Sequence, residues 1–78
     1  MIKITAFILI QTKSGKEREV LEVLQGNKKG LESAWLTYGD YDIVVKTESN
    51  DLDSLQNLLT GELKNIANIT STNTLIGL

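Results

Sequence analysis

The sequence contains no cysteine, no histidine and no proline among its 78 residues. Disulfides are therefore excluded, and the usual zinc and haem ligands are missing. Serine–histidine–aspartate and cysteine–histidine catalytic arrangements are excluded for the same reason. The glycine spacing of a dinucleotide or phosphate loop is also absent. We therefore expect a protein without a metal, without a cofactor and without enzymatic activity.

Positive charge and aromatic residues are scarce as well. The chain has 8 Lys and Arg against 10 Asp and Glu, a formal net charge of −2. A nucleic-acid binder normally presents a basic stripe on a positive total, so we expect no direct binding to DNA or RNA. The adjacent Lys28 and Lys29 are interpreted as solvated loop residues. One Phe, one Trp and two Tyr are too few for an RNA-stacking sheet.

Long apolar runs are missing too. The longest strongly apolar stretch, Ala6–Ile10, is far shorter than the roughly 20 residues that a membrane helix needs. The N-terminus shows no signal-peptide pattern, because it leads directly into alternating strand residues. We therefore expect a soluble cytoplasmic protein that has no membrane partner.

The chain length predicts one small domain over residues 1–78. A domain of this size buries only roughly 60–65% of its unfolded surface and is marginally stable alone. Since neither disulfides nor metals can support it, oligomerisation is the expected source of additional stability.

Four strand-like and two helix-like segments alternate along the chain. Strands are predicted over residues 2–11, 31–38, 41–48 and 69–76 from their β-branched and aromatic content. Ser14 and Glu17 fit a capping box that starts a first helix, which ends near Gly26 and Asn27. Asn50 or Asp51 can cap a second helix that extends to Ile66.

The resulting order is βαββαβ. Gly39 and Asp40 between two apolar runs favour a tight two-residue hairpin turn with positive φ. Right-handed crossovers place both helices on one face of a four-stranded antiparallel sheet. The predicted fold class is therefore α+β and ferredoxin-like.

The first and third strands are apolar on both sides. In the first strand Phe7 and Leu9 oppose Ile8 and Ile10, and in the third strand Val44 opposes Ile43 and Val45. Two helices can cover only one face, so the open face would be an exposed apolar patch of the kind that marks interfaces. We expect this face to pack against a second copy of the chain, the alternative being a shallow exposed patch on a monomer.

Two polar segments are candidates for ligand binding. Asp40 and Asp42 lie in the run Tyr38–Asp42 and could pair with a ligand ammonium, although Asp and Gly are also ordinary turn residues. In the fourth strand Thr70, Thr72 and Thr74 project from one side, opposite to Ser71 and Asn73. Their hydroxyls could donate to a carboxylate, although threonine is a good strand former anyway. Together the two segments suit a zwitterionic amino acid, and they need not come from the same subunit.

These two segments also carry a resemblance to a known family. Residues 38–46 and 70–76, in this order and separation, closely resemble the effector-binding (RAM) domain of Lrp/AsnC-type transcription regulators. The resemblance implies dimers packed sheet to sheet, often joined in rings of dimers, with amino-acid effectors in clefts between dimers. It implies that Gly39, Asp40, Tyr41 and Asp42 of one subunit and Ser71, Thr72 and Thr74 of a neighbour bind the effector.

One departure limits what the resemblance implies. Regulators of this type carry an N-terminal helix-turn-helix domain, whereas the resemblance here begins at Ile4, so DNA binding is not carried over. A stand-alone domain could sense an amino acid or join full-length regulators. Two alternatives stay open: a small dimeric α/β-barrel enzyme using Tyr38, Tyr41, Asp40 and Asp42 for acid–base work, and an ACT-like allosteric domain.

Overall fold

A four-stranded antiparallel sheet forms the centre of the fold. The computed structural model describes residues 3–26 and 33–77. The strand order is β2-β3-β1-β4, so the first and third strands lie inside and the fourth forms an edge. The elements are β1 (Ile4–Thr12), α1 (Glu17–Gly26), β2 (Ser33–Leu36), β3 (Ile43–Ser49), α2 (Leu52–Asn57), the π-helix η1 (Leu58–Leu63) and β4 (Ile69–Gly77).

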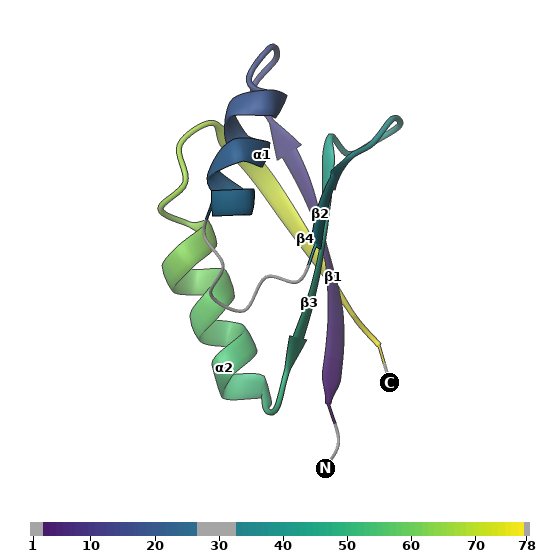
Figure 1. The fold of residues 1–78 in the computed structure, drawn as a ribbon, viewed down its shortest axis with the longest axis vertical. Coiled ribbons are helices and arrows are strands. Elements are labelled where there is room, and N and C mark those ends of the chain that lie inside the picture. The colour runs from purple at the N-terminus through teal and green to yellow at the C-terminus, as the bar shows by residue number, and fades with distance from the viewer. Residues whose placement is uncertain (1–2, 27–32, 78) are drawn as a thin grey trace.

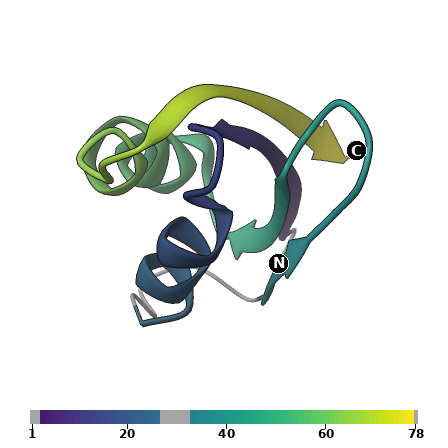
Figure 2. The same cartoon turned by 90° about the horizontal axis from the view of Figure 1, so that it is seen from above.

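The ferredoxin-like α+β fold predicted from the sequence is confirmed. Figures 1 and 2 show both helices on the same side of the sheet, with α2 beside β4. The predicted strand starts at Ile2 and Leu31, the helix end at Asn27 and the Lys28–Lys29 pair lie outside the described residues. Within the described ranges, no helix is long and apolar enough to cross a membrane.

The hydrophobic core lies between the sheet and the two helices. Alternate residues of β1 and β3 face the helices. Ala6, Ile8, Ile10, Ile43 and Val45 are each 0% exposed. Val20 and Leu24 of α1 and Leu55 of α2 close this core from the other side, each at most 2% exposed.

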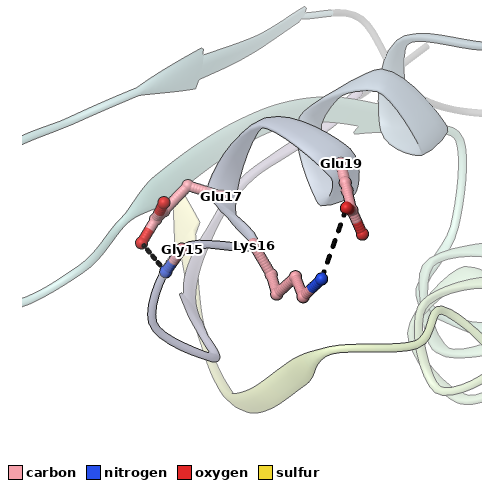
Figure 3. A network of polar contacts seen from close by, with 4 residues as sticks. All are labelled: Gly15, Lys16, Glu17 and Glu19. Atoms are coloured by element: carbon pink, nitrogen blue, oxygen red, sulfur yellow. Dashed lines mark hydrogen bonds and ion pairs between the residues drawn. The ribbon is translucent and has the colours of Figure 1, made fainter.

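The start of α1 differs from the predicted capping box. Gly15, with φ +82°, and a hydrogen bond of 3.0 Å from Lys16 N to Lys13 O form a turn before the helix. The helix therefore begins at Glu17, and Ser14 lies too early to cap it. The Glu17 carboxylate accepts from Gly15 N at 3.1 Å instead of from Ser14 (Figure 3). The prediction of Ser14 as N-cap was wrong because the positive-φ turn delays the helix.

The second helix begins as predicted and then widens. Asp51 Oδ1 accepts from Ser54 N at 2.7 Å, so Asp51 rather than Asn50 is the cap. From Leu58 to Leu63 the helix continues with π-type turns. Wide turns of this kind are rare and often lie at functional sites. Here the widened segment faces β4.

The connection between β2 and β3 is longer than predicted. Pairing stops at Leu36 and Ile43, and residues 37–42 form a loop closed by Thr37 N donating to Asp42 O at 2.9 Å. Gly39 has a positive φ of 109°, as a turn glycine should. The antiparallel hairpin is confirmed, but its two-residue turn is wrong. The reason is that Asp42 N donates to Ile10 O of β1 at 2.9 Å and the Thr37 hydroxyl donates to Tyr41 O at 2.8 Å, so these bonds take the place of the hydrogen bonds of a tight turn.

Candidate functional site

The loop of residues 37–42 is held against β1 by Asp42. One carboxylate oxygen, Asp42 Oδ2, accepts from Thr12 N at 2.8 Å and from the Thr12 hydroxyl at 3.3 Å. The contact is partly buried, and a carboxylate accepting from backbone amides forms charge-assisted hydrogen bonds. Asp42 therefore positions the loop. Asp40, by contrast, is exposed and contacts the sheet through its backbone carbonyl.

Gln11 connects this loop to β4. Its side-chain amide donates to Asp40 O at 2.8 Å, and its side-chain oxygen accepts from the Ser71 hydroxyl at 2.6 Å. Beside it, Asn73 Nδ2 donates to the Tyr41 hydroxyl at 3.2 Å. The structure thus brings Asp40 and Tyr41 together with Ser71, three of the predicted site residues. Sequence reasoning did not single out Gln11, because its partner depends on the pairing register of β1 and β4.

The two remaining predicted residues of β4 lie on the opposite side of the sheet. Thr72 pairs with Ile10 and Thr74 pairs with Ile8, both of which face the helices. Ser71 pairs with Gln11 instead, on the open face. Successive residues of a strand point to opposite faces, so Ser71 and the Asp40 carbonyl that Gln11 joins to it lie on the face opposite to the hydroxyls of Thr72 and Thr74.

A groove follows the helix side of β4. Its volume is about 340 Å³, and its apolar lining comes from η1, the segment after it and the first residue of β4: Leu59, Leu63, Ile66 and Ile69. Its polar lining is Thr60 and four residues of β4, of which Thr70 and Ser71 already bond to Gln11 while Thr72 and Thr74 do not. Lys64, which is exposed, stands at the rim. A second hollow of about 420 Å³ lies beside the loop, between Arg18 of α1 and Asp42. Acidic residues in the described ranges do not gather in a group that could hold a metal ion.

Comparison with known proteins shows to which family the chain belongs. The family model of the Lrp/AsnC ligand binding domain matches residues 5–78. The chain belongs to this family. The HTH-type transcriptional regulator FL11 of Pyrococcus furiosus is 43% identical over 56 residues, which cover 72% of this chain and 36% of FL11. The chain thus spans about a third of this curated relative, a transcription regulator.

Solved structures of similar proteins have the same fold. The protein PHS023 from Pyrococcus horikoshii is 39% identical with a TM-score of 0.87, over 96% of this chain and 89% of that one. E. coli AsnC is 33% identical with a TM-score of 0.88, over 96% of this chain and 50% of AsnC. The NMB0573/L-Met complex from Neisseria meningitidis shares the fold at 16% identity and a TM-score of 0.82, over 96% of this chain and 49% of that protein.

Proposed function

We propose that the chain is a non-enzymatic regulatory module that binds an amino-acid effector and self-associates. Membership in the Lrp/AsnC ligand binding domain family supports a role in effector binding within transcriptional regulation. The distant relative NMB0573 was solved in complex with L-Met, which supports an amino acid as the ligand class. A regulatory module of this kind would act in the cytoplasm.

One observation carries the proposal that the site is shared between subunits. The loop carrying Asp40 lies with Ser71 on the open side of the sheet, whereas Thr72 and Thr74 lie on the helix side. An amino acid needs an anion for its ammonium and neutral donors for its carboxylate. Two subunits can supply both halves when the loop of one approaches the threonine-lined groove of the other. We therefore propose Gly39, Asp40, Tyr41 and Asp42 from one subunit with Ser71, Thr72 and Thr74 from its neighbour.

The open face of the sheet supports self-association. Phe7, Trp35 and Leu75 remain 38%, 48% and 52% exposed on a surface that the helices do not reach. The register places Phe7 opposite Leu75, and Leu9 opposite Val44, which in turn pairs with Trp35. A contiguous apolar surface of this kind is typical of an interface. We propose a homodimer with face-to-face sheets, which associates further into rings and can also include full-length Lrp/AsnC regulators.

Calorimetry of the purified chain against each standard amino acid tests the sensing function. At least one should bind, and Asp40→Ala should weaken binding because it removes the exposed carboxylate proposed to hold the ammonium. Light scattering over a dilution series tests assembly and should show particles of at least two 8.6 kDa chains. Failure of every amino acid to bind would contradict the sensing function, and a stable monomer at all concentrations would contradict the shared site.

A further inference from the structure

The groove between η1 and β4 has a composition that selects a particular type of ligand. One wall is apolar: Leu63 is 2% exposed, and Leu59, Ile66 and Ile69 are half-buried and pack against the hydrophobic core. The volume of about 340 Å³ lies at the lower end of the range of small-molecule pockets, about 300–1,000 Å³. The groove therefore suits a ligand that is small and largely aliphatic.

The opposite wall offers free hydrogen-bond donors. Within the described residues, the hydroxyls of Thr72 and Thr74 form no hydrogen bond, whereas the Thr70 hydroxyl already donates to Gln11 O at 3.0 Å. The Lys64 ammonium at the rim is likewise paired with no acidic side chain in the described ranges. One cation and two neutral donors beside an apolar wall are complementary to a carboxylate attached to an aliphatic chain.

A third hollow continues the groove along α2. It shares Leu59 and Thr74 with the groove and has a volume of about 400 Å³. It is lined further by the apolar residues Leu52, Leu55 and Ile76 and by the polar residues Asp53 and Gln56. An aliphatic side chain can therefore extend along an apolar surface. An acidic side chain placed there would lose hydration against the apolar wall and would face the Asp53 carboxylate, which is unfavourable.

We propose that this groove binds the carboxylate of the effector at Lys64, Thr72 and Thr74 and its side chain against Leu59 and Leu63. The chain then selects amino acids with aliphatic side chains. This inference rests on the proposed function, since the ammonium of the ligand would be held by the loop of a neighbouring subunit. Lys64, which neither the sequence patterns nor the family resemblance singled out, is its main determinant of affinity.

Calorimetry of the full chain tests this selectivity with leucine, valine, aspartate, lysine and 4-methylpentanoate. Leucine and valine should bind at least tenfold more tightly than aspartate, whose side chain would face the Asp53 carboxylate. Lys64→Met should weaken leucine binding roughly tenfold, the effect of losing one hydrogen bond to a charged group. Lys13→Met is the matched control, because it removes the same charge from an exposed position outside the groove and should leave affinity unchanged. Thr72→Val keeps a good strand-forming residue and removes one hydroxyl donor, so it should weaken leucine binding several-fold. It replaces Lys64→Met as the test if that variant does not fold.

The outcomes separate this inference from the function on which it rests. Tight binding of aspartate or lysine with no binding of leucine would overturn the aliphatic selection and leave the effector function intact. Equal affinities of Lys64→Met and Lys13→Met for leucine would overturn the role of Lys64. The compound 4-methylpentanoate has no ammonium, so its binding without that of any amino acid would support the groove and remove the amino-acid effector function.

Discussion

The two faces of the sheet are built from the same strands but differ in what covers them. On the helix side of β1, Ile8 and Ile10 are completely buried, while on the open side Phe7 is 38% exposed. Both faces are apolar at the centre. The covered face obtains its partners from the same chain and so determines whether the domain folds. The open face lacks partners in the chain, and we propose that it determines assembly instead.

The largest effect is expected from truncating the covered face. Ile8→Ala should lower the free energy of unfolding by about 2–5 kcal/mol, because it removes buried methyl groups and leaves a cavity. For a domain of this size such a loss approaches the total stability. Urea denaturation followed by circular dichroism measures it. If the urea midpoint of Ile8→Ala equalled that of the wild type, the covered face would not be the source of the domain's stability.

The neighbouring residue on the open face should respond differently. Phe7→Lys should leave the monomer folded but weaken self-association more than tenfold, because it places a charge in the proposed interface. Sedimentation over a concentration series measures the dissociation constant, with circular dichroism as the check on folding. Lys3→Glu, which changes a charge outside the apolar patch, is the control and should leave self-association unchanged. Unaltered association of Phe7→Lys would exclude the open face as the interface.

A smaller effect separates the two aspartates of the loop. Asp42→Ala should lower the free energy of unfolding by about 1–3 kcal/mol, because Thr12 N loses its acceptor. Asp40→Ala should change stability little, since Asp40 contacts Gln11 through its backbone carbonyl. Thermal denaturation of both variants at the same pH makes the comparison. Equal losses would show that the carboxylate of Asp42 does not anchor the loop.

The smallest effect concerns the cap of α2 and its pH dependence. The Ser54 amide donating to the Asp51 carboxylate holds the pKa of Asp51 below its ordinary value. Because the folded-state pKa is lowered, the stabilisation is present above the unfolded value of about 3.9 and is lost as the pH falls through the folded value. Asp51→Asn keeps a capping side chain but cannot titrate. The melting temperatures of wild type and Asp51→Asn should therefore converge in acid, and a constant difference would contradict the assignment.

Sequence reasoning succeeded where one local pattern decides the outcome. Alternation in β1 correctly indicated that Ile8 and Ile10 differ in side from Phe7, and Asp51 was one of two residues proposed as the cap. It failed where a distant partner intervenes. In the loop 37–42, Asp42 bonds to Ile10 O and Thr12 N of β1, and a glycine between apolar runs does not reveal those bonds.

The candidate site shows the same division. The sequence pointed to Asp40, Ser71 and Thr72, because carboxylates at a turn and hydroxyls on a strand are visible in the residues themselves. Gln11 and Lys64 were missed, since each acquires its place through elements far away in the chain: Gln11 through pairing with Ser71, and Lys64 through the packing of η1 beside β4.

The sequence alone determined the order of the elements, the apolar character of both sheet faces and the residue types available for a ligand, because these depend on periodicity and composition within short segments. Tertiary structure alone decided that Ser71 joins the loop through Gln11 while Thr72 and Thr74 line a groove with Lys64. The physical reason is the register of β1 with β4. A shift of one residue would exchange the two faces of β4 without changing a single local pattern.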